Sequence, residues 1–234
     1  MSLTGVELQK KNAGYKACEY VKDGMTLGLG TGSTAYYAII RCGELIKEGF
    51  DLKAVATSQQ TAEIAKENNV PILDIDQVDH IDLAIDGVDE IDRDFNAIKG
   101  GGGALFREKI VANLAREVIW IMDENKPVQA IGSFPLPVEI LIYGHKHTLA
   151  ALAAAGLKPV LRSKDGKTFV SDNGNYIADL QLTAPLDIQK VKDQLADTVG
   201  VVETGLFLNM CDRMIMGTDD GAKVVENPGK KNRA

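Results

Sequence analysis

Two aspartates on either side of a turn are the first residues in this chain whose spacing suits acid–base chemistry. Asp86 and Asp89 lie in the stretch DGVDE, which follows an apolar run. When two carboxylates face one cavity, the pKa of one of them rises toward the range in which it exchanges protons. Asp-Gly is also a favoured turn pair, so for this stretch alone a plain turn is the more common case.

A lysine, four glycines and a glutamate follow within the segment KGGGGALFREK, residues 99–109. A run of glycines is costly in conformational entropy, so it favours a backbone shape that only glycine adopts. Glu108 would lie within the first turn or so of the helix after the glycines, where the helix dipole stabilises a carboxylate. Lys99 could stabilise a developing oxyanion. The charged neighbours Arg107 and Lys109 leave an ordinary surface helix as the alternative for Glu108.

A glycine-rich turn, GLGTGSTA at residues 28–35, is the third candidate. Its glycines let backbone N–H groups approach a ligand, and the N-terminus of the next helix favours an anion, helped by Thr31, Ser33 and Thr34. The stretch departs from the dinucleotide fingerprint GxGxxG, because Ser33 takes the third glycine position and the next strand, ending AVATS, has no acidic residue there. The alternative is a tight strand-to-helix turn with a hydroxyl cap.

All three stretches follow segments that we predict to be strands. Ligands of an open parallel sheet bind at the carboxyl ends of its strands, so a shared site is the simplest explanation. An anion cradle, carboxylates and a lysine, without a recognisable Ser or Cys nucleophile, suit proton transfer beside a carbonyl. The reaction that needs only these parts is aldose–ketose isomerisation through an enediolate, with Glu108 as base and Lys99 beside the oxyanion.

The elements that position these residues alternate between strand and helix in the first half of the chain. Predicted strands cover residues 25–30, 52–58, 70–75, 80–92 (running into the Asp-rich turn) and 117–123, and predicted helices cover 5–22, 31–49, 59–69 and 104–115. This alternation indicates βαβ units and a parallel sheet. The sequence therefore predicts a doubly wound, mainly parallel, Rossmann-like α/β domain.

The pattern changes near residue 130 to strand, helix, strand, strand, helix, strand. The predicted elements are strands at 138–144, 158–163, 175–182 and 201–207 and helices at 145–156 and 186–197. This βαββαβ order is the ferredoxin-like pattern. We predict a small inserted α+β domain at 130–205, and a catalytic α/β domain at 1–129 plus 206–234, whose sheet is rejoined by the last strands.

Composition excludes several classes of partner. The 234 residues carry a formal charge of −7 and a pI near 5.1, which argues against a nucleic-acid surface. No stretch approaches the roughly 18 apolar residues of a membrane span, and the first residues lack the apolar core of a signal peptide. The three cysteines are far apart and form no CxxC pair, which fits a reducing cytoplasm.

No metal or cofactor is expected. Asp86, Asp89 and Asp92 do not match the ligand spacing of an EF-hand loop. His145 and His147 are two apart at the start of a predicted helix, a spacing more typical of surface residues than of metal ligands.

Four motifs together carry a family resemblance. GLGTGSTA, DGVDEID, KGGGGALFREKI and FPLPVEI, in this order and spacing, closely resemble type A ribose-5-phosphate isomerase, and the similarity extends to SDNGNYI and GVVETGLF. The resemblance implies metal-independent interconversion of ribose 5-phosphate and ribulose 5-phosphate in the non-oxidative pentose phosphate pathway. It also implies that the protein binds a small sugar phosphate and that it assembles as a homodimer or homotetramer.

The resemblance assigns roles position by position. Glu108 matches the proton acceptor, and Asp86, Asp89 and Lys99 match residues expected to assist catalysis. The matching substrate-binding residues are Thr31, Gly32, Ser33, Thr34, Asp86, Gly87, Val88, Asp89, Lys99, Gly100, Gly101, Gly102 and Lys126. The segment LIYGHKHT departs from the more usual pattern, and GGGG has glycine where several relatives have alanine, but neither removes any of these residues.

Three other functions remain as alternatives. A sugar-phosphate sensor would use a related fold without turnover, although the chain has no room for a DNA-binding segment. A phosphatase would use DIDQV, residues 74–78, which imitates a DxD nucleophile motif but lacks convincing Mg²⁺ partners. Acyl-CoA transfer with a glutamate nucleophile is the third.

Overall fold

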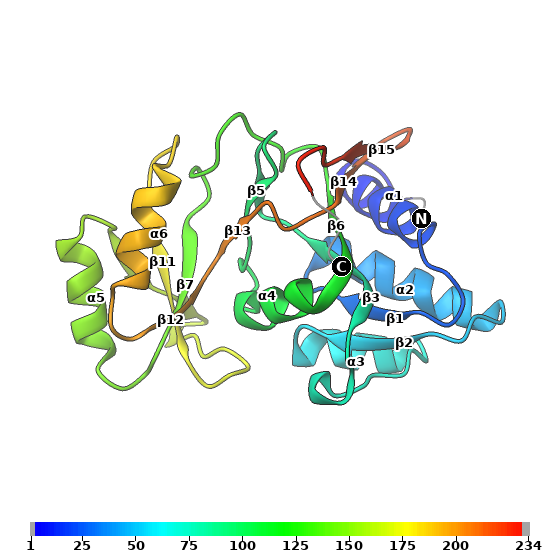
Figure 1. The fold of residues 1–234 in the computed structure, drawn as a ribbon, viewed down its shortest axis with the longest axis horizontal. Coiled ribbons are helices and arrows are strands. Elements are labelled where there is room, and N and C mark those ends of the chain that lie inside the picture. Colours follow the sequence, from blue (N-terminus) through cyan, green and yellow to red (C-terminus); the bar gives the residue numbers. More distant parts are fainter. Residues whose placement is uncertain (1–2, 231–234) are drawn as a thin grey trace. The chain divides into compact units, whose positions relative to one another are not determined.

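The computed structural model describes residues 3–230, and the chain divides into two compact units (Figure 1). The first unit takes the described parts of residues 1–88, 107–126 and 209–234, and the second takes residues 89–106 and 127–208. Each unit has a sheet and a hydrophobic core of its own.

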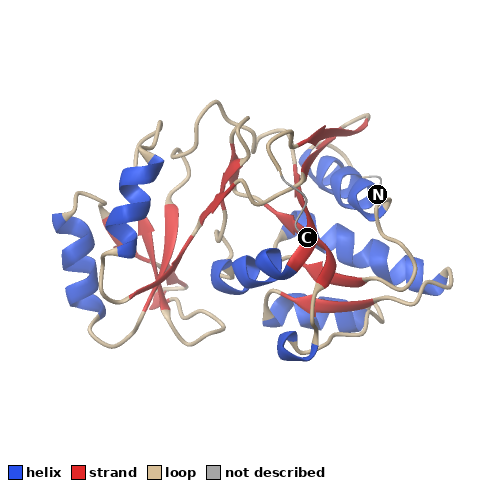
Figure 2. Cartoon of the chain, viewed as in Figure 1, coloured by secondary structure: helices blue, strands red, loops and turns tan. Residues whose placement is uncertain are grey.

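The first unit is built on a six-stranded sheet in the order β15-β14-β6-β3-β1-β2 (Figure 2). Its strands are β1 (Thr26–Leu29), β2 (Lys53–Ala56), β3 (Ile81–Gly87), β6 (Ala115–Met122), β14 (Arg213–Thr218) and β15 (Gly221–Glu226). Neighbours from β2 to β14 pair in parallel, whereas β15 pairs antiparallel with β14. The predicted doubly wound, mainly parallel α/β class is confirmed.

The helices of the first unit pack against its sheet and against one another. They are α1 (Val6–Cys18), α2 (Ser33–Lys47), α3 (Gln59–Glu67) and most of α4 (Leu105–Leu114). Apolar residues of α1 and α2, such as Ala17 and Ile39, share one core with Leu27 of β1. The two helices approach so closely that a Cβ on Gly14 would lie 2.8 Å from the backbone nitrogen of Ala38.

The second unit contains a four-stranded antiparallel sheet in the order β12-β7-β11-β8. Along the chain its elements are β7 (Leu136–Ile140), α5 (His145–Ala154), β8 (Pro159–Leu161), β11 (Tyr176–Leu180), α6 (Ile188–Ala196) and β12 (Val201–Thr204). Leu152 of α5 and Leu195 of α6 pack with Val138 of β7 in its core. The predicted ferredoxin-like βαββαβ order is confirmed.

A three-stranded sheet in the second unit was not predicted. It consists of β4 (Glu90–Ile91), β5 (Asn96–Ile98) and β13 (Leu206–Leu208), with β5 in the centre. The sequence-based division counted residues 89–106 in the first domain, but β5 pairs with β13, so this segment packs with the second unit. The predicted boundaries of the catalytic domain and of the small α+β domain stay a prediction.

Other elements differ from prediction for local reasons. The strand expected at 201–207 is two strands, because Gly205 interrupts it where a Cβ would lie 2.4 Å from the carbonyl oxygen of Lys99. The strand expected at 70–75 is a single bridge between Ile72 and Ala54, followed by the short 3-10 helix η1 (Ile75–Gln77). A short hairpin, β9 (Ser163–Lys164) and β10 (Lys167–Thr168), had no predicted counterpart.

Among residues 3–230, no helix combines the length and the apolar character that crossing a membrane requires. The thiols of Cys18, Cys42 and Cys211 are free and buried. The cytoplasmic location stays a prediction.

Candidate active site

The glycine turn after β1 and the first aspartate of DGVDE are in direct contact within the first unit. The N–H of Thr31 donates to Asp86 Oδ1 at 3.1 Å, and the N–H of Gly87 donates to the same oxygen at 2.7 Å. Asp86 is 4% exposed. A Cβ on Gly30 would lie 2.0 Å from Asp86 Oδ1, so only glycine lets the turn reach the carboxylate. The contact exists because β1 and β3 are parallel neighbours.

The hydroxyl of Thr31 points into a cluster of hydroxyls. Its Oγ1 lies 2.7 Å from Thr57 Oγ1, 2.9 Å from Ser58 Oγ and 3.0 Å from Thr61 Oγ1. Thr61 also donates to the carbonyl oxygen of Gly30 at 2.9 Å. The sequence suggested that this hydroxyl helps to hold an anion. In the structure it contacts these three hydroxyls, and its part in anion binding stays a prediction.

Thr57, Ser58 and Thr61 are therefore functional candidates that sequence reasoning missed. The signal was present in the hydroxyl-rich stretch ATSQQT, which runs from the last residue of β2 into the first turn of α3. Its meaning depends on knowing that β2 lies beside β1, with Leu29 opposite Ala56.

The N-terminus of α2 opens onto a hollow of about 300 Å³. Gly32, the residue before the helix, has φ +120° and provides no side-chain cap. The hollow is lined by Glu7, Gly32, Ser33, Tyr36, Tyr37, Ile39, Gln60, Thr61 and Ile64. N–H groups at an uncapped helix start, with the positive end of the helix dipole, suit a phosphate or carboxylate.

The second aspartate belongs to the second unit and contacts the glycine run there. Gly101 donates its N–H to Asp89 Oδ2 at 2.7 Å. A Cβ on Gly101 would lie 2.6 Å from Asp89 Oδ1. Gly100 and Gly103 have φ of +96° and +84°, in the left-handed region that favours glycine, and Gly103 donates to the carbonyl of Gly100 to close the turn. The glycines thus shape a turn around Asp89.

Lys99 is 2% exposed, which is rare for a lysine. Its N–H donates to the carbonyl of Gly205 at 3.0 Å, and its Nζ lies 5.3 Å from the centre of the Phe207 ring. Both contacts come from β13 or the residue before it. Strand β13 therefore orients the lysine within the second unit.

Glu108 lies in the first turn of α4 and is 3% exposed. The alternative of an ordinary surface position is therefore wrong. A carboxylate this buried at the positive end of a helix dipole is held in one place and is shielded from bulk water.

The remaining predicted residues have more ordinary surroundings. Lys126 is half-buried in the turn after β6, where its N–H donates to the carbonyl of Asp123 at 3.4 Å. Val88 is buried, whereas Gly102 is exposed. His147 is exposed, as predicted, whereas His145 is half-buried and its ring packs edge-on against that of Tyr176. No group of three or more His, Cys, Asp or Glu side chains within residues 3–230 is arranged to hold a metal ion.

The aspartates of the phosphatase alternative serve a turn. Asp74 accepts the N–H of Asp76 at 3.0 Å and caps η1, and both aspartates are exposed. A nucleophilic aspartate of that motif needs a preceding strand, and the structure has only one bridge there.

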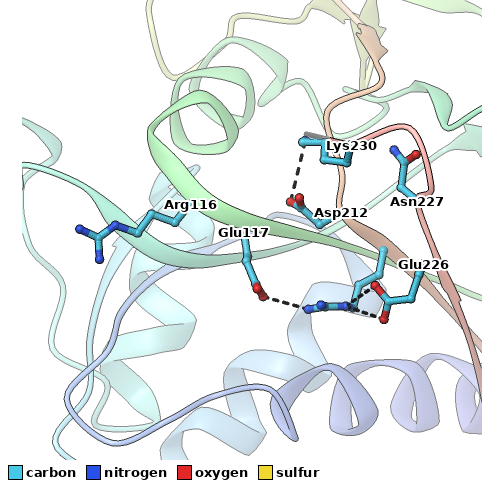
Figure 3. Close-up of a pocket in the computed structure, with 7 residues that line it drawn as sticks. Arg116, Glu117, Asp212, Glu226, Asn227 and Lys230 are labelled. Carbon is cyan, nitrogen blue, oxygen red and sulfur yellow. Dashed lines mark hydrogen bonds and ion pairs between the residues drawn. The ribbon is translucent and has the colours of Figure 1, made fainter. Parts of the chain in front are cut away.

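A second hollow, of about 470 Å³, lies beside β6, β14 and β15 (Figure 3). Its charged groups are paired. Arg213 binds Glu117 at 2.9 Å and Glu226 at 3.0 Å, Lys230 lies 3.8 Å from Asp212, and Arg116 binds Asp82, outside the hollow, at 3.3 Å. Because these pairs satisfy its charged groups, we interpret the lining of this hollow as a structural ion-pair network, which connects β14 and β15 to β6.

The chain matches known proteins over almost its whole length. The model of a family described as ribose 5-phosphate isomerase A (phosphoriboisomerase A) matches residues 53–221. A ribose-5-phosphate isomerase A of Streptococcus pneumoniae (strain Hungary19A-6) is 48% identical over 227 residues, which are 97% of this chain and 100% of the relative. One of Limosilactobacillus reuteri (strain DSM 20016) is 48% identical over 218 residues, 92% of this chain and 96% of the relative.

Solved structures agree with these matches. A D-ribose-5-phosphate isomerase in complex with phospho-erythronic acid superposes with a TM-score of 0.90 at 38% identity, covering 95% of this chain and 99% of that one. A ribose 5-phosphate isomerase from Plasmodium falciparum gives a TM-score of 0.89 at 37% identity, covering 94% and 98% of the two chains.

Proposed function

The chain belongs to the ribose 5-phosphate isomerase A family and is an aldose–ketose isomerase, and we propose that it interconverts D-ribose 5-phosphate and D-ribulose 5-phosphate through an enediolate. The observation that carries the substrate is the match along nearly the full length of named relatives. The local geometry adds two carboxylates, Asp86 and Asp89, each fixed by a backbone N–H.

The phosphate is proposed to bind at the N-terminus of α2, at Gly32, Ser33 and Thr34. The uncapped N–H groups there and the adjoining hollow support this placement. The ligand named for one solved relative, phospho-erythronic acid, is also a sugar acid with a phosphate. Such a molecule has an anion at each end, as an enediolate phosphate does.

Glu108 is proposed as the base that moves the carbon-bound proton. In the forward direction its carboxylate takes the proton from C2 of the open-chain aldose and returns it to C1, which leaves the ketone at C2. Burial at a helix start holds the carboxylate in place and keeps bulk water from quenching the intermediate. The reaction then needs no nucleophile and no redox partner.

Lys99 and the two aspartates are proposed to act on the oxygens. The ammonium group of Lys99 would stabilise negative charge on the enediolate oxygens. Asp86 and Asp89 would assist ring opening and carry a proton between the oxygens on C1 and C2. Gly87, Val88, Gly100, Gly101, Gly102, Thr31 and Lys126 would complete substrate binding.

The wider context is also proposed from family membership. We infer a role in the non-oxidative pentose phosphate pathway, a cytoplasmic location, and assembly as a homodimer or homotetramer. Carboxylates and a lysine suffice for the proposed steps, so we infer metal-independent activity.

The test is conversion of ribose 5-phosphate by purified protein after treatment with EDTA, followed by NMR. Formation of ribulose 5-phosphate without phosphate release is expected. Release of phosphate that requires Mg²⁺ would favour the phosphatase instead, and tight binding without turnover would favour a sensor.

A further inference from the structure

Arg162, just after β8, contacts the glycine run from a distant part of the same unit. Its Nη1 donates to the carbonyl oxygens of Gly100 and Gly101, both at 3.0 Å. These carbonyls are separated from the arginine by about 60 positions in the sequence, and no motif pointed to the contact.

The guanidinium is held in one orientation from behind. Its Nε donates to Asp179 Oδ2 at 2.9 Å and its Nη2 donates to Asp179 Oδ1 at 2.5 Å, a bidentate pair. The side chain of Arg162 is 13% exposed. Its backbone is fixed as well, because its N–H donates to the carbonyl of Ile177 and its carbonyl accepts the N–H of Phe169. Because Asp179 occupies the edge formed by Nε and Nη2, Nη1 is left aimed at the glycines.

A single peptide group connects this arginine to Asp89. The carbonyl of Gly100 and the N–H of Gly101 belong to the same planar peptide unit. Its oxygen accepts from Arg162, and its N–H donates to Asp89 Oδ2 at 2.7 Å. A positive donor on the oxygen polarises the peptide, which strengthens the hydrogen bond that its N–H makes.

We propose that Arg162 is a positioning residue of the isomerase reaction, acting on the Asp89 carboxylate through the Gly100–Gly101 peptide. The inference rests on the proposed role of Asp89 in that reaction. A lysine at 162 would keep the charge but not the fork, because one ammonium nitrogen cannot bind both oxygens of Asp179 and both glycine carbonyls in this geometry.

The experiment compares kcat and KM of Arg162→Lys with a matched control, Arg213→Lys. Arg213 also bridges carboxylates and is similarly buried, with 14% of its side chain exposed. We expect kcat to fall about ten-fold in Arg162→Lys and to stay unchanged in Arg213→Lys. Equal activity of the two variants would overturn the proposal.

A double-mutant cycle with Asp89→Asn separates positioning from a general loss of stability. If Arg162 acts through Asp89, Arg162→Lys lowers kcat no further when Asp89 is already Asn. Additive losses in the cycle would overturn the proposal. If Arg162→Lys does not fold, Asp179→Asn takes its place, because it loosens the bidentate pair while keeping the arginine. It is then combined with Asp89→Asn in the same double-mutant cycle, with the same expected result.

A third experiment does not measure activity, so it can show whether the role of Arg162 or the proposed isomerase function is wrong. Hydrogen exchange of the Gly101 N–H, followed by NMR, should be faster in Arg162→Lys than in wild type. Unchanged exchange would overturn the positioning role even if the wild-type protein isomerises the substrate. Faster exchange in a protein that does not isomerise ribose 5-phosphate would support the link to Asp89 and reject the proposed function.

Discussion

Asp86 accepts a hydrogen bond from the backbone of Thr31, and this contact joins the turn proposed to bind phosphate to a carboxylate proposed to act in catalysis. The N–H to Oδ1 distance is 3.1 Å. Gly30 permits the approach, and the hydroxyl cluster of Thr57, Ser58 and Thr61 holds the turn from its other side.

Replacing Thr61 by valine should weaken both the fold and substrate binding. The change keeps the shape but removes the bond to the Gly30 carbonyl, so buried polar partners are left unsatisfied at a cost of about 1–3 kcal/mol. We expect a lower free energy of unfolding in urea and a several-fold rise in KM, because the turn that precedes α2 loosens.

The matched control is Thr148→Val, which removes a buried hydroxyl bonded to the carbonyl of Val199 in the second unit. It should lower stability to a similar degree and leave KM unchanged. A rise in KM in both variants, or in neither, would count against the role assigned to the cluster.

Alanine at Gly101 should impair catalysis more than stability. The new Cβ would lie 2.6 Å from Asp89 Oδ1, the end of a side chain that can move aside, so the carboxylate is displaced while the fold remains. We expect kcat to fall about ten-fold with a small change in Tm. Alanine at Gly103 should reverse the pattern, because φ is +84° and the Phe169 ring lies 2.5 Å from the new Cβ. Equal loss of Tm in both would argue that the run is only a structural loop.

The cysteines should not react in the folded protein near neutral pH. Burial raises the pKa of the Cys211 thiol from 9.0 to about 12, and the hydrogen bond with Cys42, followed by burial, raises that of Cys18. The thiolate is the reactive form, so DTNB at pH 8 should find no fast thiol until denaturant is added. One thiol that reacts rapidly without denaturant would contradict this.

The same shift has a consequence for stability. The unfolded Cys211 thiol ionises near pH 9.0 and the folded one near pH 12, so its contribution is full below pH 9 and is lost as pH rises toward 12.

Both folds could be predicted because they follow from local patterns. The alternation of strands and helices, and the βαββαβ order after residue 130, are visible in the sequence and are found in the two sheets. The sheet of β4, β5 and β13 was missed because its strands have only two or three residues and its pairing joins segments more than 100 positions apart.

The residues of the candidate site could be predicted from the sequence only where they belong to a recognisable local motif. Asp86, Asp89, Lys99 and Glu108 stood out through their neighbours in the sequence. The contacts of Thr61 with Gly30 and of Arg162 with Gly100 depend on which strands and loops lie side by side, and no local pattern records that.

The central claim is that Glu108 moves the proton between C2 and C1. Glu108→Gln keeps the size of the side chain and one accepting oxygen but removes the base, and Glu63→Gln on the exposed face of α3 is its control. The decisive measurement is kcat for ribose 5-phosphate, with circular dichroism and Tm showing that both variants are folded. The account predicts a loss of at least about a hundred-fold for Glu108→Gln and none for Glu63→Gln. Wild-type turnover in folded Glu108→Gln would contradict it.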